Sequence, residues 1–334
     1  MTRAIPFGTY PSGETALTAT LRAGPLRCQV LSHGASLRQL EITLPDGPRN
    51  IALGLGNLAA YIAHGAHIGA TCGRYAGKIP DALVEIDGRP VTLSRNADGR
   101  HHVHGGVLGL GRRNWRLEAL TGTMARFRIL SPDGDEGYPG ALDVTCTYRL
   151  SVDALRITYS ATTTQDTPLN LLHHGYFNLD GAGTIGAHRL EIASSALIER
   201  DAAGHPTGQR QPLDKPYDFS RPRPVGNGSG IDDTYILCPD QRSEPALAAR
   251  LTAGRGDLRM DVHTTETGLH VYDGGKLNIP APGNPDGQPL MANAGICLEP
   301  TSGLVLRDDG SATRYILAAG QTYRQVTVFR LMAL

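Results

Sequence analysis

The histidines of this sequence are concentrated in two short segments. His101, His102 and His104 precede a pair of glycines, and His173 and His174 are adjacent. On a strand, His102 and His104 would point to the same face, which permits a metal site. A metal site also needs a third ligand and a supporting carboxylate, and the neighbouring sequence supplies neither. We therefore expect histidine chemistry without a metal, or histidines that hydrogen-bond within the core.

Glu299 is the most unusual carboxylate of the sequence. It follows the apolar run Ile296-Cys297-Leu298 and is followed by Pro300. This pattern predicts a strand that proline stops, with the carboxylate partly buried at the rim of a sheet. A buried charge is costly unless it is paired or functional. An ion pair, with Arg74 or another arginine, and a catalytic carboxylate are both open from this feature alone.

Three further polar residues lie in contexts where a ligand could reach them. Arg74 is flanked by small residues, so its guanidinium could face an interior groove or the surface. Asp232 and Asp233 precede a short apolar strand pattern, where paired aspartates are usually solvated turn residues. A carboxylate base, a histidine acid and several groups that bind hydroxyls suit proton transfer on a small polyhydroxylated substrate.

The elements that must position these residues are predicted to be strands. Apolar residues alternate with polar ones over 142–150 and again over 155–159, with a turn near Asp153. Residues 84–86 and 91–93 form a hairpin pattern around Asp87-Gly88, and 327–331 is a further strand pattern. Helical periodicity is confined to 58–64 and 244–251. The lack of alternation between strands and long helices argues against a doubly wound parallel sheet, and an all-β fold is predicted.

The composition indicates a globular protein with many turns. Its 334 residues include 41 glycines and 22 prolines, and the 32 basic and 32 acidic side chains cancel. A net charge of zero argues against general binding to nucleic acid or to a membrane surface. The loop-rich segment 200–230 has similar strand patterns on both sides, so we interpret it as a connection within a single domain, 1–334.

The cysteines and the start of the chain bear on localisation. The five cysteines are far apart and form no CxxC pair, which favours buried free thiols over a disulfide framework. The first ten residues lack the layout of a signal peptide, and no apolar run reaches the roughly 18 residues of a membrane span. We expect a cytoplasmic protein.

Two motifs that would imply cofactors or metals fail on inspection. The glycine pairs at 54–56 and 109–111 lack the strand-GxGxxG-helix context of a dinucleotide site. Asp133 and Asp135 begin a segment that looks like a calcium loop, but its twelfth position is Val144 instead of glutamate. No cofactor is expected.

Seven segments in order along the chain resemble those of the aldose 1-epimerase (galactose mutarotase) family. They are VLSHGASLRQLEITLPDG, GRYAGKI, HVHGG, SPDGDEGYPG, HHGYFNL, GIDDTYIL and ICLEP. The resemblance extends nearly from end to end. It implies a large antiparallel β-sandwich with a sugar-binding groove on one face, in a monomer or homodimer.

The resemblance also implies roles for individual residues. Glu299 would be the general base, and His174, which directly precedes Gly-Tyr-Phe-Asn-Leu, the general acid. The reaction that the resemblance implies is mutarotation, the interconversion of the α and β anomers of a free aldose such as D-glucose or D-galactose. It needs an ionised carboxylate and a protonated imidazole together, and we expect the negative charge of Glu299 to favour the protonated His174. Residues expected to contact sugar oxygens are Arg74, His104, Asp232 and His270.

Some positions depart from the family pattern and affect the choice of sugar. Gly73 stands where asparagine is frequent, His270 and Asp273 stand where glutamine and threonine are usual, and Pro300-Thr301-Ser302 follows the glutamate. Two other functions stay open. A hexose-6-phosphate epimerase would need a cationic cluster, for which Arg74, Lys78, Arg112 and Arg113 are candidates. A non-catalytic carbohydrate-binding protein would need aromatic platforms, but the chain has one Trp.

Overall fold

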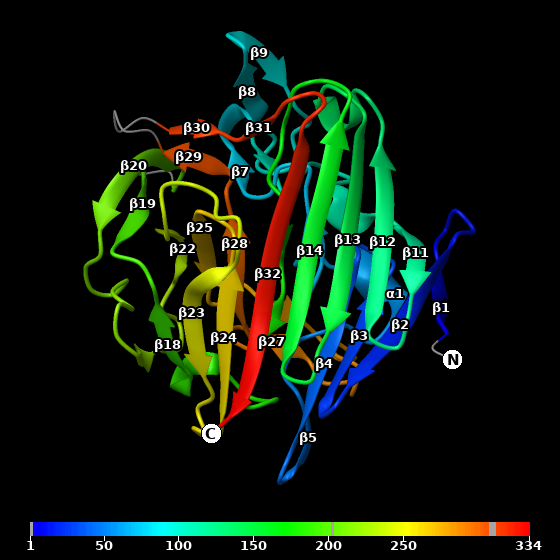
Figure 1. Cartoon of the computed structure of the whole chain (residues 1–334), viewed down its shortest axis with the longest axis vertical. Coiled ribbons are helices and arrows are strands. Elements are labelled where there is room, and N and C mark those ends of the chain that lie inside the picture. Colours follow the sequence, from blue (N-terminus) through cyan, green and yellow to red (C-terminus); the bar gives the residue numbers. More distant parts are fainter. Residues whose placement is uncertain (1–2, 202–203, 307–311) are drawn as a thin grey trace.

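The protein is built from antiparallel sheets, as its computed structural model shows for residues 3–201, 204–306 and 312–334. The predicted all-β class is therefore confirmed. The largest sheet has nine strands and faces the viewer in Figure 1. In spatial order its strands are β11 (Arg116–Leu120), β12 (Met124–Ser131), β13 (Leu142–Leu150), β14 (Ala154–Thr163), β32 (Thr322–Ala333), β24 (Leu258–Thr264), β23 (Ala246–Thr252), β18 (Arg189–Ile192) and β21 (Arg223–Pro224).

Two further sheets lie behind the nine-stranded sheet (Figure 1). The six-stranded sheet consists of β17 (Tyr176–Phe177), β28 (Ile296–Thr301), β25 (Gly268–Tyr272), β22 (Asp232–Ile236), β19 (Ala196–Arg200) and β20 (Pro206–Pro212). The five-stranded sheet consists of β1 (Ile5–Thr9), β2 (Thr15–Ala23), β3 (Leu26–Leu31), β4 (Ser36–Leu44) and β5 (Gly47–Asn50).

Short two-stranded ribbons and helical turns connect the sheets. The ribbons pair β10 (His102–Val103) with β7 (Lys78–Ile79), β15 (Thr167–Pro168) with β31 (Ile316–Leu317), β16 (Leu172–His173) with β6 (Thr71–Cys72), β26 (Asn278–Ile279) with β27 (Leu290–Met291), β29 (Leu304–Leu306) with β30 (Ala312–Arg314), and β8 (Leu83–Ile86) with β9 (Arg89–Thr92). The helices are α1 (Leu58–Ala63) and the 3₁₀ turns η1 (Pro80–Ala82), η2 (Leu110–Arg112), η3 (Asp135–Gly137) and η4 (Ile185–Ala187). In the part of the chain that the structure describes, none of these helices has the length and apolar character of a membrane span.

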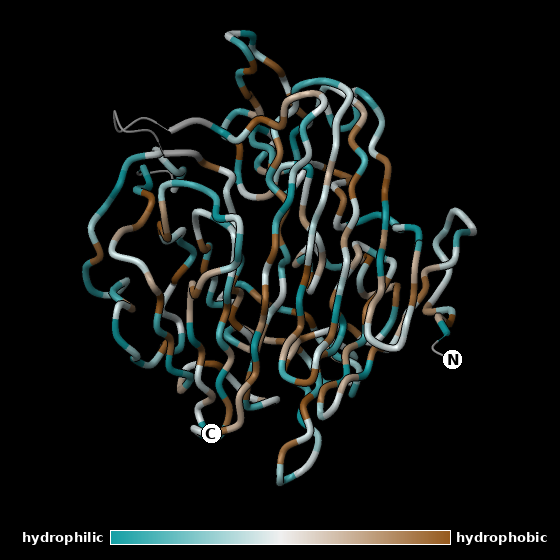
Figure 2. Tube along the Cα trace, viewed as in Figure 1, coloured by the Kyte–Doolittle hydropathy of each residue, from teal (hydrophilic) through white to brown (hydrophobic). Residues whose placement is uncertain are grey.

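The main hydrophobic core lies between the nine-stranded sheet and the two sheets behind it. It takes side chains from all three, for example Leu40 of β4, Val144 of β13 and Val271 of β25. Along β13, buried residues alternate with partly or fully exposed ones, and Figure 2 shows the matching alternation of hydropathy along the front strands. The Tyr148 hydroxyl crosses the core and donates to the carbonyl of Ala35 at 2.7 Å. Burial of one face of each strand is therefore what holds the layers together.

Several sequence predictions are confirmed by these strands. The alternating segments 142–150 and 155–159 pair in register as β13 and β14, with the turn at Asp153. The hairpin around Asp87-Gly88 forms between β8 and β9, and both turn residues have the positive φ that the tight connection needs. The helix predicted over 58–64 is α1, whose first turn is capped by the Asn57 side chain.

The helix predicted over 244–251 is wrong, because most of that segment is strand β23. Its alanines and leucines are good helix formers, but the backbone is paired on both sides, with β18 and with β24. A β-bulge between Leu247 and Ala249 places two neighbouring alanines in the core and interrupts the period-two pattern. Segment 200–230, predicted as a long connection, carries the short strands β20 and β21.

Candidate active site

One face of the six-stranded sheet gathers polar side chains from three neighbouring inner strands, β28, β25 and β22. On β28, Ile296 and Leu298 point into the main core, so Cys297 and Glu299 point to the opposite face. The antiparallel register places His270 of β25 directly opposite Glu299. The same alternation puts Asp232 and Thr234 of β22 on this face. Because β28 is buried on both faces, its sequence is a continuous apolar run broken by a single carboxylate.

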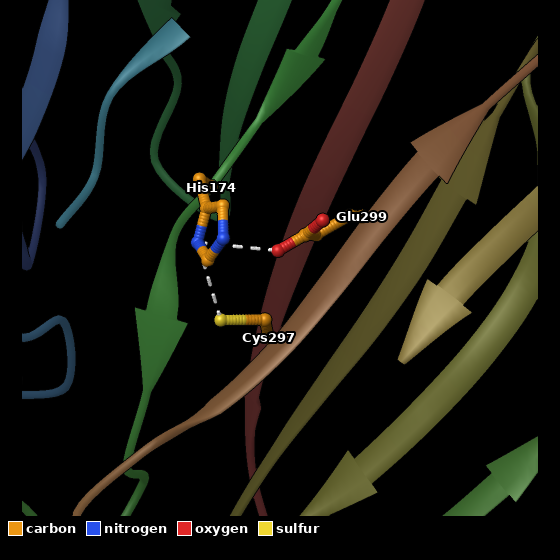
Figure 3. A group of neighbouring side chains, drawn as sticks. All are labelled: His174, Cys297 and Glu299. Atoms are coloured by element: carbon orange, nitrogen blue, oxygen red, sulfur yellow. Dashed lines mark hydrogen bonds and ion pairs between the residues drawn. The ribbon is translucent and has the colours of Figure 1, made fainter. Parts of the chain in front are cut away.

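His174 meets Glu299 across this face. The chain leaves β16 at His173, and His174 is then held by backbone hydrogen bonds with Gly69 and Ala70. Its Nδ1 lies 3.2 Å from Oε1 of Glu299 and 3.6 Å from Sγ of Cys297 (Figure 3). The predicted acid and base are thus adjacent, although 125 positions (299 minus 174) separate them in the sequence. His173 lies elsewhere, with its ring between those of Tyr148 and Phe329.

Two other histidines surround His174. The His104 ring centroid lies 5.4 Å from that of His174, and the His67 ring lies 6.0 Å from it. Tyr176 stacks on His174 at 5.1 Å. His104 was predicted for this site from its motif, whereas His67, Tyr176 and Cys297 were not. His67 lies in no motif considered, so its contribution follows from the fold and not from spacing.

The environment of the pair shifts the two pKa values in opposite directions. Burial raises the pKa of Glu299 to about 7, and the nearby charge of His270 offsets part of this rise. Burial also lowers the pKa of His174 well below its usual range, and repulsion from His104 and His67 adds to the effect. We expected the negative charge of Glu299 to favour a protonated His174, but the net shift of the His174 pKa runs in the opposite direction. The imidazole is buried among other imidazoles, and desolvation and mutual repulsion dominate.

His270 is hydrogen-bonded to two polar residues of this face. Its Nε2 donates to Oδ1 of Asp232 at 3.1 Å, and its Nδ1 lies 2.9 Å from the Thr234 hydroxyl. Lys276 approaches the second oxygen of Asp232 at 3.5 Å. Burial alone would lower the pKa of His270, but the bond to Asp232 and the charge of Glu299 outweigh it and raise that pKa. Position 270, where glutamine is usual in the resembled family, therefore carries a histidine whose protonated form is favoured beside Glu299.

Arg74 is not directed at the pair. Its guanidinium is 2% exposed and donates all five N–H groups to acceptors of the 131–140 loop. These acceptors are the Ser131 hydroxyl and the carbonyl oxygens of Ser131, Pro132, Pro139 and Gly140. A sugar contact would have to replace one of these bonds, so the structure favours a role in holding the loop.

The loop that Arg74 holds also contacts the histidine segment 101–104. Tyr138 of this loop bonds Nε2 of His102 at 2.6 Å, and Nδ1 of His102 lies 2.7 Å from the carbonyl oxygen of Ser94. His102 is therefore a satisfied core histidine. His104 does not share its face, because β10 ends at Val103 and His104 has a φ of 50°. The prediction that His102 and His104 point to the same face of one strand, where they could share a metal, is therefore wrong.

Two glycines, Gly73 and Gly105, allow the segment around His104 to lie against the segment around Arg74. A side chain on Gly105, whose φ is +88°, would collide with the carbonyl oxygen of Gly73. A Cβ on Gly73 would lie 2.6 Å from Leu171 and 3.1 Å from Leu110. The leucines therefore occupy the space that an asparagine would need, which explains the glycine in this chain.

The remaining predicted aspartates have structural partners. Asp273 is buried and accepts from the backbone of Gly230 and Gly275 and from Ser229. Asp233 lies 3.5 Å from Arg200 and accepts from the backbone N–H of Asp232. A cleft of about 140 Å³ begins at His270 and is also lined by Asn170, Thr234 and Thr301. The cleft offers hydroxyl-binding groups, but its lining includes neither His174 nor Glu299; its link to the pair is His270, which lies opposite Glu299 in the sheet.

Comparisons with known proteins show the family to which the chain belongs. Residues 18–330 match the aldose 1-epimerase family. The galactose mutarotase of Mus musculus is 31% identical over 340 residues, which cover 99% of this chain and 98% of that protein. The aldose 1-epimerase of Escherichia coli (strain K12) is 31% identical over 283 residues, covering 80% of this chain and 81% of that protein. In fold, the crystal structure of an aldose epimerase homologue from C. elegans superposes with a TM-score of 0.84 over 100% of both chains at 24% identity.

Proposed function

Because the chain belongs to the aldose 1-epimerase family, we propose that its reaction takes place at His174 and Glu299. By this relationship the protein is an isomerase that interconverts the α and β anomers of free aldoses. The observation that carries the assignment of the pair is the 3.2 Å approach of the two side chains on the polar sheet face. D-galactose and D-glucose are the proposed substrates.

The reaction requires two proton transfers at opposite sides of one carbon. A base takes the proton of the C1 hydroxyl while an acid gives a proton to the ring oxygen, and the ring opens to the aldehyde. The C1–C2 bond turns by about half a revolution, and ring closure reverses both transfers. Each positioned transfer is worth about 10²–10⁴-fold in rate. The pair must therefore contain one protonated and one unprotonated group.

The pair meets this requirement when it holds a single exchangeable proton. Since the pKa of Glu299 is raised and that of His174 is lowered, this proton resides mainly on Glu299 before the sugar binds. Nδ1 of His174 lies 3.2 Å from Oε1 of Glu299, so a reorientation that aligns the two groups would let the proton move to Nδ1. The resulting carboxylate accepts the C1 proton, and the imidazolium donates from Nε2 to the ring oxygen. The titration belongs to the pair as a unit.

The charged groups beside the pair are proposed to bind the sugar hydroxyls. Asp232 accepts hydrogen bonds and His270 donates them, while the ring of His104 lies 5.4 Å from that of His174. Hydroxyls both donate and accept, so this mixture suits a neutral sugar. Two of the four cations considered for a phosphosugar have other partners, because Arg74 is saturated by its loop and Arg113 pairs through two bonds with Asp135. Lys78, a third, lines the cleft at His270.

A reducing compartment, the cytoplasm, is proposed as the location. All five cysteines are free, and four of them are buried. Buried free thiols are typical of proteins that fold where thiols stay reduced.

Polarimetry of freshly dissolved α-D-glucose and α-D-galactose tests the proposal. We expect the protein to accelerate the decay of rotation, and Glu299→Gln to lower the rate by at least about 100-fold. Glu266→Gln is the matched control, since Glu266 is also buried but bonds Gln241 and Thr265 instead. Wild-type rates from Glu299→Gln would refute the assignment of the base. Absence of acceleration with any aldose would refute the function.

A further inference from the structure

Three potential metal ligands converge where the proposed mechanism uses two groups. Nδ1 of His174, Sγ of Cys297 and a carboxylate oxygen of Glu299 all lie within 4.8 Å of one another (Figure 3). The three side chains are buried, and Oε1 of Glu299 has no well-aligned hydrogen bond among the described residues. A buried oxygen without a partner is costly and favours an additional cationic or donor group. The proposed sugar chemistry makes no use of Cys297.

The spacing of the ligand atoms agrees with tetrahedral zinc. With Zn–N and Zn–O bonds near 2.1 Å and Zn–S near 2.3 Å, a tetrahedron places N and O about 3.4 Å apart and N and S about 3.6 Å apart. The corresponding distances here are 3.2 Å and 3.6 Å. The third pair, a carboxylate oxygen of Glu299 and Sγ of Cys297, lies within 4.8 Å. A tetrahedron places these two atoms about 3.6 Å apart, so binding of the ion is completed by movement of these two side chains toward each other. Catalytic zinc sites elsewhere also use three protein ligands and leave the fourth position to water.

We propose that Zn²⁺, or a similar borderline-soft divalent ion, binds His174, Cys297 and Glu299 and reversibly inhibits the enzyme. On binding, Cys297 releases its thiol proton to solvent, and Glu299 binds as a carboxylate. His174 binds through the lone pair of Nδ1 and keeps its remaining proton on Nε2. The ion then occupies both groups that must exchange protons with the sugar. The ion is an inhibitor and has no step in the reaction.

The ligand chemistry sets the selectivity of this site. A thiolate and an imidazole favour Zn²⁺, Co²⁺ or Cd²⁺, whereas Mg²⁺ and Ca²⁺ prefer six or more oxygen ligands. Mg²⁺ should therefore leave the rate unchanged at concentrations where Zn²⁺ inhibits. The inhibition rests on the proposed function, but binding of the ion does not.

The first test measures inhibition within each variant, as the rate with Zn²⁺ divided by the rate without it. Protein freed of metal with EDTA and desalted is titrated with Zn²⁺ or Mg²⁺ during polarimetry. Loss of groups that merely support ligands costs about 10–100-fold in metal affinity, so Cys297→Ser should raise the inhibitory Zn²⁺ concentration at least about tenfold. Cys238→Ser is the control, because Cys238 is the more accessible thiol and lines the neighbouring cleft. It should be inhibited like the wild type.

The second test detects the ion without using activity. Co²⁺ bound to a thiolate gives a charge-transfer band in the near ultraviolet, which we expect in the wild type and in Cys238→Ser but not in Cys297→Ser. An active enzyme without zinc inhibition and without this band overturns the proposal. So does equal inhibition of Cys297→Ser and wild type. If the band appears in a protein that accelerates no aldose, the metal site stands and the proposed function fails.

Discussion

Replacing Glu299 should make the protein more stable at alkaline pH while it removes the activity. The pKa of this carboxyl is raised from its usual 4.5 to about 7, mainly by burial. Between pH 4.5 and about pH 7, the folded state therefore keeps a proton on Glu299 that the unfolded state has already lost. Stability therefore falls as pH rises from 4.5 to 7, and the loss is complete above 7.

The size of the effect follows from this shift. At about 1.4 kcal/mol per pH unit, the ionised carboxylate destabilises the fold by about 3 kcal/mol at pH 8. Glutamine does not titrate, so any cost of burying its amide is the same at every pH. The stability difference between Glu299→Gln and wild type should therefore change in favour of the variant by about 2 to 3 kcal/mol between pH 5 and pH 8.

Urea unfolding at pH 5 and pH 8 measures this difference for each protein. Glu85→Gln, on the exposed side of β8, controls for replacing a carboxylate with an amide in solvent. Titrating groups remote from Glu299 are common to both proteins and cancel in the comparison. His270 does not cancel, because the charge of Glu299 raises its pKa, so the measured difference belongs to Glu299 together with this neighbour. A difference between Glu299→Gln and wild type that is the same at both pH values would refute the argument that this carboxylate is buried at a cost.

The remaining predictions concern the neighbours of the pair. His270→Gln removes a positive charge beside Glu299, so the pKa of the pair should rise. The alkaline fall of kcat/KM, which marks loss of the single proton, should then move to higher pH; an unmoved profile would contradict the electrostatic role of His270. Arg74→Lys supplies three donors for five acceptors and should cost about 2–4 kcal/mol in urea unfolding, with little change in KM. A large rise in KM at unchanged stability would instead restore Arg74 as a sugar contact.

Local patterns predicted the strands because one face of each is buried. The alternation over 142–150 was sufficient to predict β13, and Asp87-Gly88 was sufficient for the β8–β9 turn. The helix predicted for the segment of β23 was wrong, because a bulge breaks the alternation there and the residues favour a helix. Pairing with neighbouring strands decided the outcome there, and a local window contains no information on such neighbours.

The composition of the site could be predicted in part from the sequence. Motifs indicated His174, Glu299, Asp232 and His104, and the fold brings them to one region. The protonation of the pair could not be predicted, since the pKa of His174 depends on His67 and His104, which come from separate loops. The loop-holding role of Arg74 likewise depends on contacts with residues about 60 positions away. Such effects follow from three-dimensional proximity, not from spacing.

The place of β32 in the nine-stranded sheet has a consequence for biosynthesis. This strand joins β14 to β24, yet it follows every other strand of the sheet in the sequence. While the ribosome makes the intervening segments, β14 and β24 each present an unpaired edge. Unpaired edges invite association with other chains, so the nascent protein is exposed to aggregation until β32 emerges. The sheet is completed when this segment inserts between the two edges, and the full core forms around it.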